Sequence, residues 1–257
     1  MLVTGGTGAL GRATVERLRA AGYEVRVMSR RARSDPGTVL GDLFSGKGIR
    51  EALQSVDTIV HAASATRQPW RYGQVDVEGT RRLLGLAAEA GVRHLLYVSI
   101  VGMERASGYP YYRYKLRAES VVKAGPVPWS ILRAAQFPYL IDLLLRFGSI
   151  GPFLFVPRGW KFQVVDIGDV ADRIVRAVAE GPRGTLEDFC GPEQLSTEQY
   201  ASAWLQARRL RKRVVPVLIP GRTSRAFGEG KICCAGPGPG RRTWAEWLAA
   251  RYRPDAG

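Results

Sequence analysis

The feature that most constrains this chain is a glycine-rich turn close to its first residues, Gly5-Gly6-Thr7-Gly8-Ala9-Leu10-Gly11. Residues 1–4 before the turn are apolar and β-prone, and residues 12–21 after it carry apolar side chains at helical spacing. Residues 23–28 then alternate between apolar and polar side chains, as a half-buried strand does. The first thirty residues therefore predict strand, turn, helix and strand, which is the βαβ unit of a parallel sheet.

The alternation of strand and helix continues along the chain. Further strands are predicted at residues 39–42, 58–63, 95–98 and 129–132, and helices at residues 48–56, 77–90 and 111–124. Most of these strands are nearly uninterrupted apolar runs, which is typical of a parallel sheet covered by helices on both faces. The sequence therefore predicts an α/β fold with a doubly wound parallel sheet.

The pattern changes after Arg133. Aromatic residues, proline and glycine crowd residues 137–160, and three further helices are predicted at residues 169–179, 197–210 and 243–251. No low-complexity linker separates this part of the chain from the first. We therefore expect a sheet domain at residues 1–133 and a smaller, partly discontinuous substrate lobe at residues 134–257, segments of which can return to the sheet.

The composition is that of a globular protein with an excess of positive charge. The chain has 257 residues, of which 46% are hydrophobic and 24% charged, and this excludes a mainly disordered chain. The formal net charge is +15, and the densest basic segment is residues 208–213. A basic surface attracts nucleic acid, anionic lipid or phosphorylated ligands, whereas the plain alternative is a solvated helix end. Because no aromatic residue interleaves with these charges, we disfavour a nucleic-acid partner.

Cysteine and histidine usage argues against disulfide and metal chemistry. The three cysteines are Cys190, Cys233 and Cys234, an odd number without the spacing of a disulfide framework. We therefore expect no disulfide, and a reducing, cytoplasmic location. The two histidines, His61 and His94, have no second His or Cys at ligand spacing, so we expect no metal site.

The longest apolar stretch of the chain covers residues 137–157. Asp142, Arg146 and Pro152 interrupt it, as do two glycines, whereas a bilayer span needs about 20 predominantly apolar residues in a row. We therefore expect no membrane partner.

The glycine spacing indicates a dinucleotide site. A Cβ at Gly5, Gly8 or Gly11 would collide with a pyrophosphate or with the neighbouring strand. The helix that follows would direct its free N–H groups and the positive end of its dipole at the same anion. The alternative is a purely structural turn. The predicted cofactor contacts in this segment are Gly5, Thr7, Gly8, Ala9, Leu10, Gly11 and Arg12.

The end of the second strand indicates which dinucleotide binds. A site for NAD places an acidic residue there to hold the ribose 2′-hydroxyl. This chain has Ser29, Arg30, Arg31 and Arg33 instead, and no carboxylate before Asp35. A guanidinium matches a 2′-phosphate, so we predict that Ser29 and Arg30 help to bind NADP(H) in preference to NAD(H).

A second pattern combines Tyr111 and Lys115, four residues apart in a predicted helix and so on one helix face. An ammonium near a phenol lowers the pKa of the phenol, which suits proton exchange with a carbonyl or an alcohol. Ser99, at the end of a predicted strand, is placed to hydrogen-bond the same substrate oxygen. We predict Tyr111, Lys115 and Ser99 as catalytic residues; the alternative for the first two is a surface pair.

Together these motifs resemble the short-chain dehydrogenase/reductase superfamily. The resemblance lies in residues 4–11, 60–63, 75–80, 97–99 and 111–119. Residues 129–137 and 165–171 narrow it to the atypical, NmrA-like NAD(P)H-binding branch. The resemblance implies a Rossmann-type sheet and covers nearly the whole chain, although it is faint at residues 216–239.

The resemblance also implies roles for individual residues. Lys115 would hold the nicotinamide ribose, and Tyr111 would be the acid/base. Many extended members carry Ser or Thr further along the loop after the Ser99 strand, where this chain has Ile100 and Val101, and this leaves the third catalytic partner open. The further cofactor contacts implied are Asp42 and Leu43 at the adenine, and Ala62, Ala63 and Ser64 along the dinucleotide.

The aromatic residues after residue 136 suit a flat apolar substrate, and we predict Phe137, Tyr139 and Trp160 as substrate contacts, with a role in the core of the lobe as the alternative. The leading expectation is an NADPH-dependent oxidoreductase that reduces a small apolar or polycyclic ketone or enone. Two alternatives stay open: an NADP(H)-sensing regulator without turnover, and an epimerase, isomerase or dehydratase on the same fold. Helices of this family often pair in dimers, so a homodimer also stays open.

Overall fold

The computed structural model describes residues 1–66 and 68–252. The chain divides into two compact units, and each is discontinuous in sequence. Compared with the expected boundary at residue 133, the second unit also takes residues 101–108, and the first unit takes residues 170–187. The first unit comprises Met1–Ile100, Tyr109–Arg133 and Val170–Glu187; the second comprises Val101–Gly108, Ala134–Asp169 and the chain from Asp188 onward.

The first unit is built on a seven-stranded sheet in the order β10-β6-β5-β4-β1-β2-β3. Strand β1 lies between β2 and β4 and pairs in parallel with both. The prediction of an α/β fold with a doubly wound parallel sheet is confirmed. The strands are β1 (Leu2–Thr4), β2 (Arg26–Ser29), β3 (Thr38–Leu40), β4 (Thr58–His61), β5 (His94–Ile100), β6 (Trp129–Ala134) and β10 (Gly184–Thr185).

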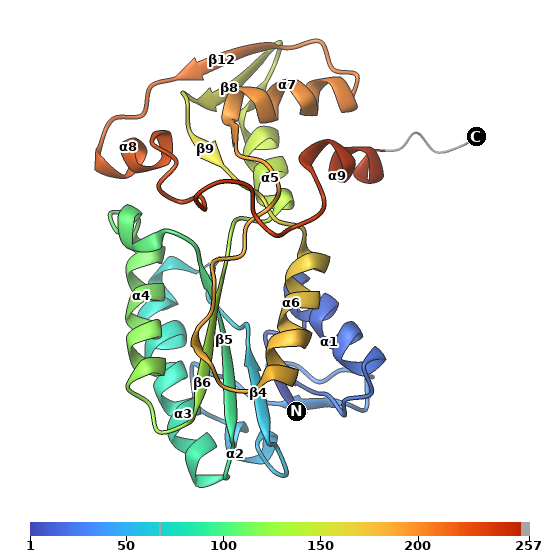
Figure 1. Ribbon diagram of the computed structural model, residues 1–257, viewed down its shortest axis with the longest axis vertical. Helices are drawn as coiled ribbons and strands as arrows, with labels where there is room; N and C mark the ends of the chain where they lie inside the picture. Colours follow the sequence, from blue (N-terminus) through green and yellow to red (C-terminus); the bar gives the residue numbers. More distant parts are fainter. Residues whose placement is uncertain (67, 253–257) are drawn as a thin grey trace, which may run out of the picture. The chain divides into compact units, whose positions relative to one another are not determined.

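Helices cover both faces of this sheet (Figure 1). Helices α1 and α6 lie on one face, where Arg17 and Asp172 form an ion pair of 2.6 Å between them, and α3 and α4 lie on the other. A π-helical turn, η2, directly precedes α3, where the sequence predicts one continuous helix from residue 77. The helices are α1 (Ala9–Ala20), α2 (Ile49–Ala52), η1 (Pro69–Arg71), η2 (Tyr72–Glu78), α3 (Gly79–Glu89), α4 (Pro110–Lys123) and α6 (Ile167–Glu180).

The core of the first unit consists of the apolar strand residues and the inward faces of these helices. Leu2, Ile59 and Leu95 come from three neighbouring strands and are fully buried. Leu83 of α3 and Ala118 of α4 pack in the same cluster. The sheet is therefore a rigid platform, and the carboxyl ends of β1, β2, β4 and β5 meet at one edge, where ligands of such sheets bind.

The second unit combines helices with two small sheets. Helix α5 occupies a segment for which the sequence predicts no helix, because its proline and aromatic residues suggest irregular structure. Pro138 stands at the first helical position, where a missing N–H costs nothing. The elements are η3 (Met103–Ala106), α5 (Pro138–Gly148), β7 (Ser149–Ile150), β8 (Phe153–Pro157), β9 (Lys161–Phe162), β11 (Leu195–Ser196), α7 (Thr197–Ala207), β12 (Arg213–Val217), α8 (Arg222–Gly228) and α9 (Trp244–Arg251).

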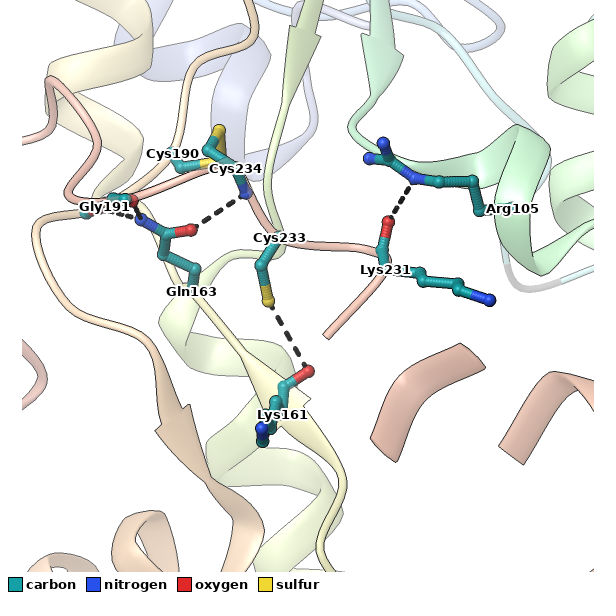
Figure 2. The surroundings of a disulfide bond; sticks show 9 residues. Arg105, Lys161, Gln163, Cys190, Gly191, Lys231, Cys233 and Cys234 are labelled. Atoms are coloured by element: carbon teal, nitrogen blue, oxygen red, sulfur yellow. Dashed lines mark hydrogen bonds between the residues drawn. A yellow bond between two sulfur atoms is a disulfide. The ribbon is translucent and has the colours of Figure 1, made fainter. Parts of the chain in front are cut away.

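A disulfide joins Cys190 and Cys234 within the second unit (Figure 2). Gln163 bridges the two sides of this crosslink, because its side-chain amide donates to the Gly191 carbonyl at 3.0 Å and accepts from the Cys234 N–H at 2.9 Å. Cys233 is a buried free thiol. The expectation of no disulfide is therefore wrong: folding brings together two cysteines that are 44 residues apart, which no local spacing reveals.

Candidate active site

The turn after β1 requires glycine at two positions, because a Cβ at either would collide with the backbone. Gly5 has a φ of +72°, and a Cβ there would run into the backbone of Ala62 and Ala63 at the end of β4. A Cβ at Gly11 would collide with the carbonyl oxygen of Gly5. The turn is closed by the Gly8 N–H, which donates to the Gly5 carbonyl at 2.9 Å. The backbone is thus shaped for close approach by a ligand.

Helix α1 begins directly at this turn, with Gly8 as its N-cap. No side chain caps it, and no acidic residue stands in its first turn, so its terminal N–H groups and dipole favour an anion. The Arg12 guanidinium donates to the Thr7 carbonyl at 2.6 Å, and this keeps a positive charge beside the turn. A pyrophosphate therefore fits these residues. Ala9 is exposed beside them, whereas Leu10 is buried under the helix.

The end of β2 is positively charged. Ser29 is buried and its hydroxyl exchanges hydrogen bonds with the backbone of Arg31, which turns the chain sharply. Arg30 is exposed beside this turn. The nearest carboxylate in sequence, Asp35, is paired with Arg19 at 3.0 Å. This arrangement suits a phosphate more than a ribose hydroxyl.

The residues expected at the adenine and along the dinucleotide lie at the ends of β3 and β4. The Asp42 carboxylate accepts the N–H of Phe44 at 3.1 Å and the Ser45 hydroxyl at 3.1 Å, so it holds a turn. Leu43 is buried in the core. Ala62, Ala63 and Ser64 follow β4 directly and are half-buried.

Ser64 and Tyr111 meet at this edge of the sheet. Their hydroxyl oxygens lie 3.0 Å apart. The Ser64 hydroxyl also donates to the Asp76 carboxylate at 2.5 Å, and the second oxygen of that carboxylate accepts the Ala65 N–H at 3.1 Å. Since Ser64 gives its proton to Asp76, its oxygen is free to accept the proton of Tyr111. The three side chains therefore form a hydrogen-bonded chain from a phenol to a carboxylate.

Asp76 is a functional candidate that the sequence analysis missed. It lies in the π-helical turn η2, and such turns occur often at functional sites. Burial raises the pKa of its carboxyl, although the Lys115 ammonium and the bond from Ser64 oppose the rise. A buried carboxylate that accepts from a serine hydroxyl beside a tyrosine can fix the direction of both hydroxyls. The sequence signal that could have identified Asp76 is its position as an acidic residue in the connection between β4 and α3, which begins at the carboxyl edge of the sheet.

Lys115 is buried and held by two partners from β5. Its ammonium donates to the Tyr97 hydroxyl at 2.6 Å and to the Val98 carbonyl at 2.9 Å. Burial lowers the pKa of Lys115 to about 8, while Asp76 and Glu119 pull it upward. The ammonium is thus fixed in direction one helical turn from Tyr111.

The expected lowering of the Tyr111 pKa by Lys115 does not occur in this structure. Burial raises the pKa of Tyr111 well above its ordinary value, and only the bond to Ser64 opposes this rise. The Lys115 ammonium donates to Tyr97 and Val98 instead. Tyr111 is therefore a neutral phenol near neutral pH, which suits a proton donor.

The Ser99 hydroxyl is directed to a different group. Ser99 is buried and hydrogen-bonds the carboxylate of Glu119. Arg133 holds the same carboxylate with two bonds, of 2.8 and 2.7 Å. The serine hydroxyl beside Tyr111 is thus that of Ser64, three residues after β4, whereas Ser99 of β5, which the sequence predicts at the substrate oxygen, contacts Glu119.

The histidines serve the core. His61 bridges Thr4 at 2.6 Å and Thr80 at 2.9 Å, and burial lowers its pKa to about 3, so the ring is neutral. His94 bonds the Ser130 hydroxyl at 3.0 Å. Within residues 1–66 and 68–252, no group of three His, Cys, Asp or Glu side chains is arranged to hold a metal ion.

The expected substrate contacts lie in the second unit. The rings of Phe137 and Tyr139 stack with centroids 6.0 Å apart at the start of α5. Trp160 instead stacks on Phe227 at 4.7 Å and donates to the Ser224 hydroxyl at 2.8 Å, so it is part of the internal packing of this unit. Phe137 and Tyr139 therefore contact each other, whereas Trp160 contacts Phe227 and Ser224.

Comparison with known proteins decides the family. Residues 5–140 match the family described as NAD(P)H-binding. The chain belongs to this family. The predicted NAD(P)H-binding family is confirmed by this match, and a short-chain dehydrogenase/reductase structure shares the fold.

Curated relatives of this NAD(P)H-binding chain are named for different functions. It is 31% identical over 208 residues to a (4-alkanoyl-5-oxo-2,5-dihydrofuran-3-yl)methyl phosphate reductase of Streptomyces griseus, covering 77% of this chain and 70% of that protein. It is 27% identical over 192 residues to the photosystem II assembly factor Ycf39 of Trieres chinensis, covering 69% of this chain. The chain spans 59% of the length of that Ycf39.

Solved structures show the same fold. The NADPH-dependent quinone oxidoreductase QOR2 of Escherichia coli, complexed with NADPH, superposes with a TM-score of 0.79 at 16% identity, over 98% of this chain and 99% of that one. A short-chain dehydrogenase/reductase superfamily protein of Agrobacterium tumefaciens with bound NAD superposes with a TM-score of 0.75 at 23% identity, over 97% of this chain and 94% of that one. Among the described residues, no helix is long and apolar enough to cross a bilayer.

Proposed function

We propose that this protein is an NADPH-dependent oxidoreductase that reduces the carbonyl or enone group of a small apolar substrate. The observation that carries the proposal is the hydrogen-bonded chain Tyr111–Ser64–Asp76 at the sheet edge where the glycine turn fits a pyrophosphate. A binding fold that only senses a nucleotide has no need of a neutral phenol linked to a buried carboxyl.

The glycine turn and the N-terminus of α1 bind the pyrophosphate. Arg30, with Ser29 shaping its turn, binds the 2′-phosphate and so selects NADP(H) over NAD(H). Asp42 and Leu43 border the adenine, and Lys115 holds the nicotinamide ribose through its ammonium. The bound nicotinamide supplies a hydride to the substrate.

Tyr111 donates its proton to the substrate oxygen as negative charge develops there. The Tyr111 phenolate then regains a proton from solvent, while Ser64, whose hydroxyl donates to the Asp76 carboxylate, keeps the Tyr111 hydroxyl in position. In this scheme Ser64 takes the place that the sequence analysis gave to Ser99, because the Ser99 hydroxyl is bound to Glu119.

The aromatic pair Phe137 and Tyr139 supports the proposed substrate class. Phe137 and Tyr139 present stacked rings, which favour a flat apolar or aromatic compound. The relative named as a reductase of an alkanoyl- and oxo-substituted dihydrofuran phosphate supports a carbonyl compound with an unsaturated ring. We retain the cytoplasm as the proposed location, although the disulfide removes the cysteine argument for it.

A second candidate, a nucleotide-sensing regulator without turnover, is favoured by the similarity to Ycf39, whose name describes an assembly factor. Oxidation of NADPH against a panel of apolar ketones, enones and quinones separates the two. We expect loss of the reduced-nicotinamide absorbance in proportion to product formed with at least one class. Binding of NADPH without oxidation by any of them would favour the regulator, and conversion without net NADPH loss would favour an epimerase, isomerase or dehydratase.

A further inference from the structure

The second unit carries an apolar sheet face that the proposed reaction does not use. It is formed by β7, β8 and β12, and we call it the open sheet face. In the strand register Ile150 pairs with Phe153, and Val215 pairs with Phe155. Paired residues project to the same side of a sheet, and alternate residues along a strand share a side. The open sheet face therefore carries Arg213, which pairs with Phe153, and the apolar residues Ile150, Phe153, Phe155, Val215 and Val217, of which Val215 is half-buried.

Packing leaves this side of the sheet uncovered. Along β8, Leu154 and Val156 are buried, whereas Phe153 and Phe155 are exposed. Helices α5 and α7 both contact β8 (Figure 1) and are tied together by the Trp204 indole, which donates to Asp142 at 2.7 Å. The two helices therefore cover the Leu154 side, and the phenylalanines face solvent.

Exposed apolar side chains also lie at the ends of these strands. Ile150, at the tip between β7 and β8, is 62% exposed, and Leu218, directly after β12, is 73% exposed. Ile219 is exposed beside it. Contiguous apolar surface of this kind on a folded protein marks an interaction site.

Positive charge surrounds this surface. Residues 143–165 and 199–228, which include β7, β8 and β12, contain ten Lys and Arg residues and no Asp or Glu. Arg213 pairs in register with Phe153. Arg209, Arg211 and Arg213 are all exposed, and within the described residues none of the three pairs with a carboxylate. The basic segment of the sequence therefore lies at the border of the open sheet face.

We propose that the open sheet face and its arginines bind the surface of an anionic lipid bilayer. The apolar side chains enter the boundary between headgroups and acyl chains, and the arginines contact lipid phosphates. The apolar side chains of the face neither donate nor accept hydrogen bonds, whereas a protein interface uses about one hydrogen bond per 100–200 Å². Nucleic acid is disfavoured because the exposed set is mostly aliphatic, and bases stack on aromatic rings.

This binding is peripheral. The sequence expectation of no membrane partner rests on the interruptions in residues 137–157, which exclude a span and leave open a contact at the bilayer surface. The proposal does not depend on the reaction, because none of its residues belongs to the Tyr111 chain or to the glycine turn.

Co-sedimentation of the full chain with lipid vesicles tests the proposal. We expect it to pellet with mixed phosphatidylglycerol and phosphatidylcholine vesicles at about 0.1 M salt, to bind pure phosphatidylcholine poorly, and to be released as salt is raised. Arg211→Glu with Arg213→Glu should weaken binding about tenfold or more. Ile150→Ser with Leu218→Ser should weaken it several-fold by removing apolar insertion. Circular dichroism and thermal unfolding of each variant verify that it is folded.

A matched control reverses two exposed arginines of the first unit, Arg176→Glu with Arg183→Glu, and should leave vesicle binding nearly unchanged. Equal loss in this control would mean that net charge alone drives binding and would overturn the proposal. The proposal would also be overturned if the wild-type chain did not bind vesicles. It would be overturned as well if the chain preferred an RNA oligonucleotide and the Arg211 and Arg213 variants abolished that binding. A wild-type dimer that Ile150→Ser dissociates would assign the face to a second copy instead.

Discussion

Replacing Tyr111 by phenylalanine is expected to lower kcat for NADPH-dependent reduction by about 10²–10⁴-fold, the usual contribution of a positioned acid. The substitution removes the proton that Tyr111 donates and the end of the chain through Ser64 to Asp76. It leaves the glycine turn and Lys115 intact, so the affinity for NADPH should stay within about twofold. Steady-state turnover and nucleotide titration of the same preparation check both values.

Tyr114→Phe is the matched control for this prediction. Tyr114 lies on the same helix, and its ring contacts that of Tyr72 at 5.8 Å, but no bond joins it to Ser64. Its substitution should change kcat little. Full activity of the Tyr111 variant would remove that residue from the chemistry, and an equal loss in both variants would indicate a structural role for the tyrosine cluster.

Breaking the Cys190–Cys234 disulfide is expected to lower the free energy of unfolding by about 4 kcal/mol, from the entropy of a closed loop of this length. The crosslinked residues are 44 positions apart, and both sides are also held by Gln163 (Figure 2). Cys190→Ser, or reduction of the wild-type protein by a dithiol, should therefore shift denaturant unfolding to lower concentration. Thiol titration of the unfolded, unreduced protein should find one thiol, and three after reduction.

Cys233→Ser is the control here, because Cys233 is outside the crosslink and its thiol points to the Lys161 carbonyl. Burial raises the pKa of Cys233 to about 11, which makes it a poor nucleophile for exchange with the neighbouring disulfide. This variant should keep the stability gained from the crosslink. Three reactive thiols in the protein before reduction would show that the disulfide does not form.

The fold of the first unit was predictable because its signals are local. The glycine turn, the apolar strand runs and the helical spacing each occupy a short stretch of sequence, and parallel strands joined by helices permit few topologies. The fold of the second unit was harder to predict from the sequence. Strand β7 has only two residues, and β8 and β12 are paired across more than fifty residues of chain. Helix α5 begins with Pro138, a residue type that is also common in loops.

The candidate site was predictable only in part, for a similar reason. Tyr111 and Lys115 form a helical pair visible in sequence, and Gly5, Gly8 and Gly11 carry their own spacing. The contact of Tyr111 with Ser64 joins residues 47 positions apart. The place of Asp76 depends on a π-helical turn, which has no clear sequence pattern. Which serine hydroxyl meets the phenol is therefore a tertiary property.

We infer that the glycine turn and the arginines after β2 bind a nicotinamide dinucleotide that carries a 2′-phosphate. Calorimetric titration with NADPH and with NADH tests it most directly. We expect one site that binds NADPH about tenfold or more tightly than NADH, since a charge-assisted bond to the 2′-phosphate contributes about 1.5–3 kcal/mol. Arg30→Glu should abolish this preference and leave NADH binding in place. No heat with either nucleotide, or tighter binding of NADH by the wild-type protein, would contradict the account.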